Sequence, residues 1–363
     1  MSASDGRREL GAALGEANVA HGVGGEGSPV AFPGSAGDVA AALKVAREID
    51  RAVVVGGADA AALTLDLGRM TQVLHLDETS LLVHAQAGIT VAALEVALAA
   101  HGLSLGPAAR RSGGRTVGAL LSSPHPGEAS PRGRLSDACA AVDGVLADGT
   151  VINTRLAPRR ATGPDLARAL LGARGATGVI TAAWLRCLRR PPERKFAAFA
   201  FSAGAGAIEA SQALLDRGAR PSDLSLVDGP IAIPALETGE LESREVLWVI
   251  ALDGVAETVG AELKLASDLA GEHGARFLSS ALAEAWFQTQ IDGRFESFVT
   301  TTALAKAWSE RGERAELSGF TAAGAALMSD RPAENEPDPL AAIRDAIARR
   351  LDPTSLFSRR KRT

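Results

Sequence analysis

The first half of the chain alternates between the helical and the strand period of apolar residues. In "PGSAGDVAAALKVAREI", residues 33–49, apolar residues recur at roughly helical spacing behind Ser35 and Asp38, either of which can act as an N-cap. A short apolar run, "VVV", follows and predicts a strand that leads into Gly56-Gly57. A glycine pair at a strand end is typical of a tight turn or of backbone that approaches a phosphate.

The next segments predict two more strands and a second helix. "VLHLD" (73–77) alternates apolar and polar residues like a half-buried strand, and "LLVHAQAGIT" (81–90) is a further strand. "TVAALEVALAAHGL" predicts an amphipathic helix that opens on Thr90 and closes near Gly102.

A long loop and a hairpin come next. Residues 106–133, "GPAARRSGGRTVGALLSSPHPGEASPRG", predict a long irregular loop, and such loops inside compact domains are usually functional. "DACAAVDGVLADGTVIN" (137–153) predicts a strand, an Asp-Gly turn and a strand. "GPDLARALLGARG" (163–175) predicts a helix and "TGVITAAWLRCL" (177–188) a closing strand.

The second half begins at a proline pair, Pro191-Pro192. Beyond it strand-like runs alternate with helices, the longest of which is expected from about Val255 to His273, and "MSDRPAENEPDP" is a linker. Hairpin signals and half-buried strands mix with helices, so the expected fold class is α+β. The expected organisation is an N-terminal segment (1–27), a first domain (28–192), a reduced α/β second domain (193–330), and a linker, helix and basic tail (331–363).

Composition narrows the function classes. The chain has 363 residues and no Tyr, so a mechanism with a phenolic acid or base is excluded. Its formal net charge of −5 gives no reason to expect nucleic-acid binding. Its two cysteines form no C-x-x-C pair, so an iron–sulfur cluster or structural zinc within the chain is not expected. No signal-peptide h-region and no apolar run near the roughly 20 residues of a bilayer span are found, so a cytoplasmic location is expected.

Two of the four glycine-containing turns are suited to a cofactor. "RTVGALLSS" combines a hydroxyl, bare backbone and Arg115, which are suitable donors for a pyrophosphate. "GARGATGVIT" carries glycine-rich backbone directly into an apolar strand, as where a planar ring lies against main chain. Neither has the G-x-G-x-x-G spacing that opens a helix, so a Rossmann site is disfavoured.

The order of segments resembles the FAD-binding domain of the vanillyl-alcohol oxidase / p-cresol methylhydroxylase superfamily. The similar pieces are "P-x-S-x-x-D-V", "LDLGRMTQVLHLDETSLLVHAQAGIT", "GL-x-L-x-P", "TVGALLSS", "RLSDACAAVDGVLADGTV", "TGPDLARALLGARGATGVIT" and "LRRPP", within residues 28–192. The tail "AIRDAIARRLDPTSLFS" is also similar. Chain length and the reduced second domain most resemble the small FAD-binding subunit of bacterial glycolate oxidase.

The resemblance implies a set of FAD-binding residues, held largely through backbone. The first pyrophosphate loop is then formed by Gly56, Gly57, Ala58, Asp59 and Ala60, and the residues beside pyrophosphate and flavin are Thr116, Val117, Gly118, Ser122 and Ser123. Asp137 is the acid ahead of the central strand. The main chain on the adenosine side belongs to Gly175, Gly178, Val179 and Ile180. A solvated basic loop or an anion clamp is formed by Arg110, Arg115, Arg132 and His125.

Departures from the family pattern leave two functions open. Asp59 stands where a donor is usual, and the second half contains one histidine, His273, where catalytic relatives have a cluster. No His stands where a covalent flavin link is expected, so FAD would be non-covalent. One reading is an FAD-binding oxidoreductase subunit of a 2-hydroxy-acid dehydrogenase complex, with a larger flavoprotein subunit and an iron–sulfur subunit as partners. The other is a non-catalytic structural or assembly subunit with weak or no FAD. No catalytic residue and no metal ligand is assigned.

Overall fold

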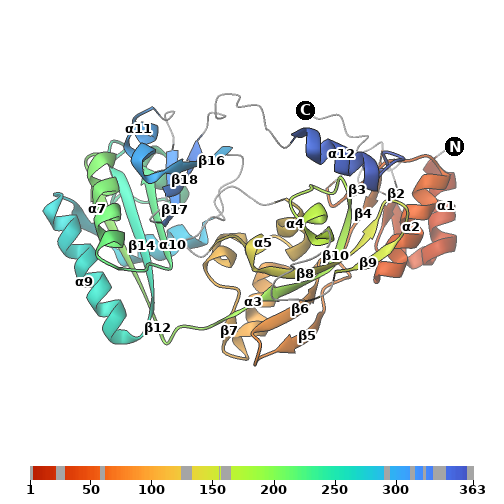
Figure 1. The fold of residues 1–363 in the computed structure, drawn as a ribbon, viewed down its shortest axis with the longest axis horizontal. Coiled ribbons are helices and arrows are strands. Elements are labelled where there is room, and N and C mark those ends of the chain that lie inside the picture. Colours follow the sequence, from red (N-terminus) through yellow and green to blue (C-terminus); the bar gives the residue numbers. More distant parts are fainter. Residues whose placement is uncertain are drawn as a thin grey trace.

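The computed structural model describes residues 3–21, 29–57, 62–123, 133–154, 156, 165–289, 295–310, 315–321, 324–329 and 341–357. Two lobes lie side by side, and the chain passes from the first to the second just before β12 (Figure 1). Helices and strands are mixed in both lobes, which confirms the α+β class.

A four-stranded sheet with two helices starts the first lobe. Its strand order is β1-β2-β4-β3, with β3 paired parallel to β4. Ser35 starts α2, because its hydroxyl accepts a hydrogen bond from the Asp38 N–H as the sequence predicts. The elements are α1 (Ala3–Leu14), η1 (Glu16–Asn18), β1 (Val19–His21), β2 (Pro29–Ala31), α2 (Ala36–Glu48), β3 (Val53–Val55) and β4 (Leu63–Leu65).

A five-stranded antiparallel sheet completes the first lobe, in the order β5-β6-β10-β8-β9. Val145 and Val179, near one end of β8 and β10, belong to the same buried core as Val53 and Leu63, so the two sheets pack directly together. The elements are β5 (Val73–Asp77), β6 (Leu82–Gln86), α3 (Val91–Ala99), β7 (Leu103–Ser104), η2 (Pro107–Ser112), α4 (Val117–Ser122), α5 (Leu135–Ala138), β8 (Cys139–Leu146), β9 (Val151–Asn153), α6 (Leu166–Leu170), β10 (Gly178–Arg186) and β11 (Leu188–Arg189).

The second lobe is a seven-stranded sheet with helices on both faces. Its strand order is β15-β12-β14-β13-β17-β18-β16. Side chains from α7, α9 and α11 share one core with the sheet, and those of α8 and α10 share a second core with it. The elements are β12 (Glu193–Phe201), α7 (Gly204–Asp216), β13 (Asp223–Asp228), α8 (Gly229–Leu236), β14 (Val246–Gly254), α9 (Ala256–Glu272), β15 (Arg276–Leu278), α10 (Ser280–Gln288), β16 (Phe295–Thr300), η3 (Thr301–Ala303), α11 (Leu304–Ser309), β17 (Ala315–Thr321) and β18 (Gly324–Ser329).

The C-terminal end of the chain returns to the first lobe. After the second lobe, α12 (Ala341–Leu351) lies beside the four-stranded sheet (Figure 1). Leu356 and Phe357 are buried in the same core as α2 and β3. The first lobe is therefore built from both ends of the chain.

The segment 106–133 differs from the expected irregular loop. Its described part contains η2 and α4, and the run "RTVGALLSS" opens a helix at Thr116, whose hydroxyl accepts from the Ala119 N–H at 3.2 Å. The expectation failed because the frequent Gly, Pro and Ser residues of this stretch favour turns, although Thr is a good N-cap for a short helix. The helix expected from Val255 to His273 agrees with α9, within one residue at each end.

One packing contact of the second lobe yields a prediction. A Cβ on Gly204, the first residue of α7, would come 1.9 Å from the indole Nε1 of Trp308, which is 4% exposed. Gly204→Ala should therefore lower the free energy of unfolding by about 1–3 kcal/mol. Gly260→Ala is the control, because Gly260 lies in α9 with open space at its Cβ position. It should be neutral or stabilise by about 0.5–1 kcal/mol. Urea unfolding of both variants measures this, and equal effects would contradict the contact.

Candidate functional site

Two helices of the first lobe, α3 and α4, begin side by side and are capped in the same way. The Thr90 hydroxyl accepts from the Ala93 N–H and the Thr116 hydroxyl accepts from the Ala119 N–H, each at 3.2 Å. Thr90 and Thr116 also form an isolated antiparallel bridge. The two N-caps are thus paired backbone to backbone.

Each helix start also donates to the segment that precedes the other helix. The Val91 N–H donates to the Arg115 carbonyl, and the Val117 N–H donates to the Ile89 carbonyl, each at 2.9 Å. One residue further along, Ala92 N–H donates to the Gly113 carbonyl at 3.0 Å and Gly118 N–H to the Ala87 carbonyl at 2.8 Å. The two helix starts thus exchange backbone hydrogen bonds in a symmetric way. We call residues 87–93 and 113–119 the capping pair.

The capping pair contains two glycines that face the opposite segment, but only one of them is at a close contact. Gly113 lies opposite Ala92, with 3.7 Å between its Cβ position and the Ala92 Cβ. Gly118 lies opposite Ala87, where a Cβ would come 2.8 Å from the Ala87 Cβ and 3.1 Å from its carbonyl oxygen. Gly118 is therefore required by the approach of the Ala87 backbone.

The capping pair changes the role expected for Thr116, Val117 and Gly118. The first N–H groups of a helix are its anion-binding groups, but here those of Val117, Gly118 and Ala119 all have protein acceptors. The N-terminus of α4 therefore does not offer its backbone to a pyrophosphate. Thr116 keeps a hydroxyl proton to donate, because its oxygen is the atom used in the cap.

The sequence carries a signal for the capping pair that the motif analysis missed. "GITVAAL" at 88–94 and "GRTVGAL" at 114–120 share the pattern G-x-T-V-x-A-L, spaced 26 residues apart. Two copies of one capping sequence, each opening an apolar helix, indicate two equivalent helix starts.

The other end of α4 meets the glycine loop that precedes β10. The Arg115 guanidinium Nη2 donates to the Ser123 carbonyl at 3.1 Å, and a cation is favourable beside the carbonyl end of a helix. Gly172 N–H donates to the Leu121 carbonyl and Arg174 N–H to the Ser122 carbonyl, each at 2.8 Å. Ser122 and Ser123, which the resemblance groups with Thr116, Val117 and Gly118, are thus brought against the loop 172–175.

Gly175 and Gly178 differ in what they do. Gly175 has φ of +77° and nothing within 4 Å of its Cβ position, so the loop is open there. Gly178 starts β10, where a Cβ would come 2.7 Å from the Val145 carbonyl oxygen of β8. Val179 and Ile180 pair with β8 in the same ladder. The backbone of these three residues therefore builds the sheet, which is a structural role that the resemblance did not indicate.

The glycine pair after β3 is open. Gly56 and Gly57 have φ of +66° and +77°, in the left-handed region, and no atom lies within 4 Å of either Cβ position. The Gly56 N–H donates to the Leu65 carbonyl at 2.9 Å, which fixes the start of the loop to β4. Ala58, Asp59 and Ala60 lie outside the described residues, as do His125 and Arg132. The side chain of Arg110 lies outside them too.

Asp137 has a local partner. Its carboxylate Oδ2 accepts from the Arg134 N–H at 2.9 Å, at the start of the short helix α5. A carboxylate at a helix start is favourable because it satisfies a backbone donor there. This contact accounts for an acid at this position without a cofactor.

The histidines on the strands lie away from the capping pair. His84 Nε2 lies 2.9 Å from Asp143 Oδ2, and its ring stacks on Trp184 with centroids 4.6 Å apart. His75, on the neighbouring strand, also contacts the Trp184 ring. Both histidines therefore belong to the polar face of the five-stranded sheet, as their alternation with apolar residues predicts.

The two thiols are unpaired with each other and poorly reactive. Cys139 and Cys187 are both free and buried, and burial raises the pKa of each thiol to about 12. Within the part of the chain that the structure describes, no group of three His, Cys, Asp or Glu could hold a metal ion. Among the described helices none is long and apolar enough to cross a membrane.

The described residues fit an extended cofactor such as FAD at two places. Gly56-Gly57 and the loop of Gly172 and Gly175 are turns with positive φ and open space at their Cβ positions, so backbone there can approach a ligand closely. The strand before the first turn and the strand after the second share one core, through Val53 and Val179. The fit is at these loops rather than at the start of α4.

The capping pair gives a prediction with an internal control. Gly118→Ala should lower the free energy of unfolding by about 1–3 kcal/mol, because its methyl group meets Ala87. The double variant with Ala87→Gly should recover part of this loss, because the nearer contact is removed. Thermal unfolding of the wild type, both single variants and the double variant measures the coupling, and strictly additive losses would contradict the contact.

Part of the chain is similar to a known family and to known proteins. Residues 28–155 match the FAD binding domain family. The uncharacterised FAD-linked oxidoreductase YgcU of Escherichia coli (strain K12) is 31% identical over 133 residues, 36% of this chain. The mitochondrial D-lactate dehydrogenase [cytochrome] 1 of Saccharomyces cerevisiae is 27% identical over 169 residues, 46% of this chain. The matched segments cover only 28% of the length of each of these relatives.

Similarity in fold extends over almost the whole chain. The 4-ethylphenol oxidase from Gulosibacter chungangensis superposes with a TM-score of 0.73 at 16% identity, covering 96% of this chain and 86% of that one. At this identity the likeness shows the fold alone. Residues 28–155 therefore match an FAD binding domain, in a chain whose fold is shared with 4-ethylphenol oxidase.

Proposed function

We propose that this chain is the FAD-binding subunit of an oxidoreductase complex that acts on a 2-hydroxy acid such as glycolate. The carrying observation is the pair of open glycine turns, at residues 56–57 and 172–175, in a domain that matches the FAD binding family. The similarity to a D-lactate dehydrogenase supports a 2-hydroxy acid as substrate class.

The residues of the two turns would hold FAD through main chain. Gly56 and Gly57 would face the pyrophosphate, and Ser122, Ser123 and Gly175 would lie beside the remainder of the cofactor. Bound flavin supplies a two-electron acceptor for the hydride of the 2-hydroxy acid. Arg115 would be a support rather than a clamp, because one of its nitrogens already holds the Ser123 carbonyl.

Non-covalent binding is supported by the described histidine rings. His75 and His84 contact Trp184. His101 Nδ1 lies 2.7 Å from Glu78, and His273 Nδ1 lies 3.5 Å from Glu209. Each of these rings therefore has a contact within the protein, and each lies on an element other than the two glycine turns.

Electrons would leave the flavin through another protein. The two cysteines of the chain are free and buried, and their raised pKa keeps both thiols protonated, so neither is a ready thiolate ligand for a cluster. The acceptor would be another subunit or a soluble electron acceptor, and a larger flavoprotein subunit with an iron–sulfur subunit would be partners of this kind.

A second function is favoured by one observation. The backbone donors at the start of α4 are already bonded within the protein, so one of the places expected to bind phosphate does not do so. This fits a structural or assembly subunit of the same complex that has weak or no FAD.

Flavin binding and substrate reduction separate the two functions. Purified protein should be yellow, or should gain a flavin spectrum with FAD, and anaerobic glycolate or D-lactate should bleach it when the partner subunits are present. Gly57→Ala should raise the Kd for FAD about tenfold or more, because a methyl group enters the open turn. Gly102→Ala is the matched control, since Gly102 has a similar φ of +67° and equally open space but follows α3.

A colourless protein that gains no spectrum with FAD would contradict the oxidoreductase and support the structural subunit. An equal loss of FAD affinity in Gly57→Ala and Gly102→Ala would contradict the role of the first turn. Yellow protein that no 2-hydroxy acid bleaches in the complete complex would contradict the substrate class.

A further inference from the structure

The last described residues of the chain form a compact turn that holds itself together. Asp352 is 2% exposed, and its carboxylate accepts from the Leu356 N–H and the Phe357 N–H, each at 2.8 Å. The Thr354 hydroxyl also donates to this carboxylate, at 3.3 Å. We call residues 352–357 the C-terminal latch.

The C-terminal latch closes the free edge of β3. In the four-stranded sheet β3 is the last strand, with β4 on one side only. On the other side the Val53 N–H donates to the Leu356 carbonyl at 2.9 Å. Leu356 and Phe357 are 4% and 9% exposed and lie in the same core as Val53. The latch therefore supplies a hydrogen-bond acceptor and buried apolar side chains at the edge of β3 that has no neighbouring strand.

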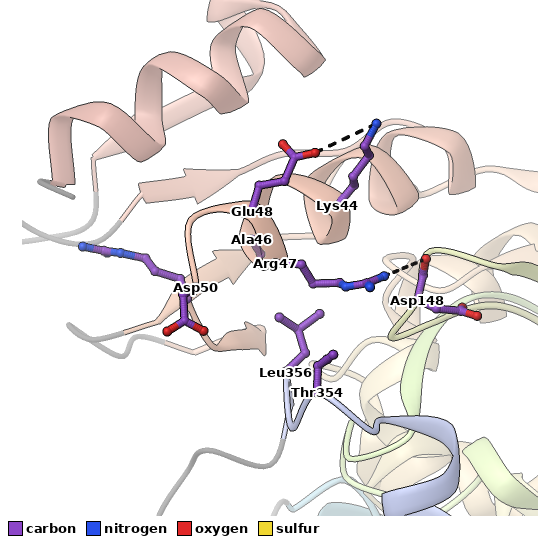
Figure 2. A pocket seen from close by; sticks show the side chains of 9 residues that line it. Lys44, Ala46, Arg47, Glu48, Asp50, Asp148, Thr354 and Leu356 are labelled. Carbon is purple, nitrogen blue, oxygen red and sulfur yellow. Dashed lines mark hydrogen bonds and ion pairs between the residues drawn. The ribbon is translucent and has the colours of Figure 1, made fainter.

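Part of the latch is separated from the end of α2 by a pocket. A pocket of about 550 Å³ lies between Thr354 and Leu356 of the latch and the last turn of α2 (Figure 2). In that pocket Arg47 reaches across to the Asp148 carbonyl, at 3.2 Å, rather than to the latch. The hydrogen bond to β3 and the buried Leu356 and Phe357 are thus the main attachments of the latch.

The strand that the latch holds ends directly in the first glycine turn. β3 is three residues long, and Gly56 follows it. An edge strand this short has few bonds that resist fraying, and a ligand that binds its ordered form must then supply the ordering free energy. Whatever fixes β3 at Val53 therefore also fixes the direction in which Gly56 and Gly57 leave the sheet.

We propose that the C-terminal latch is a positioning segment for FAD, in which Leu356 acts through Val53 to hold the first glycine turn ready for the pyrophosphate. This proposal rests on the proposed binding of FAD by that turn. The chain reaches the latch only after it has built the second lobe, so cofactor affinity depends on residues about 300 positions away from the turn in the sequence.

The test compares FAD affinity with stability in three variants. Asp352→Ala opens the latch, and a chain that ends at Leu351 lacks it. Leu10→Ala is the control, because Leu10 is fully buried in the same core but lies on α1, which contacts α2, β1 and β2. The Kd for FAD should rise about tenfold or more in the two latch variants and less than about twofold in Leu10→Ala, at temperatures where all remain folded.

Equal losses of FAD affinity at equal losses of Tm would show that the latch only stabilises the fold, and would overturn the proposal. Hydrogen exchange in FAD-free protein gives a second readout, which is independent of the proposed function. The amides of residues 53–57 should exchange faster in Asp352→Ala than in wild type or Leu10→Ala. Unchanged exchange there would also overturn the proposal, even if wild-type protein binds FAD.

Discussion

Buried backbone donors need acceptors, and the structure of this site depends on how the starts of α3 and α4 satisfy that requirement. Each helix start donates to the segment before the other, so no external anion is needed at either. The exchange brings the backbone at Gly118 close to Ala87, and this approach requires a glycine there.

The same constraint links the two sheets of the first lobe. The capping pair joins the segment after β6 to α4, and α4 in turn accepts two hydrogen bonds from the loop that leads into β10. β10 packs through Val179 against the sheet that ends in Gly56 and Gly57. The two glycine turns are thus connected through packed backbone, and the C-terminal latch covers the edge of β3.

Much of this fold follows from local sequence signals. The Ser35 cap, the strand before Gly56, the Asp-Gly hairpin of β8 and β9, and the long helix α9 were all predicted, because capping residues, turn residues and periodicity act over a few positions. The resemblance also predicted an FAD-binding domain, which the family match confirms.

The parts that sequence reasoning missed depend on contacts distant in the chain. Gly118 and Gly178 were assigned to the cofactor, but one is needed by the backbone at Ala87 and the other by the backbone at Val145. Such an approach cannot be seen from the residue itself, because a glycine beside a ligand and a glycine beside a strand have the same local sequence. Only the repeated G-x-T-V-x-A-L pattern pointed to the first of these contacts.

Hydrogen exchange of the wild-type protein with and without FAD tests the central claim most directly. The account predicts that FAD slows exchange at the amides of the two glycine turns, within residues 53–57 and 172–175. Exchange at residues 91–93 and 117–119 should stay the same, because those amides already have protein acceptors. Slower exchange at 117–119 together with unchanged glycine turns would contradict it.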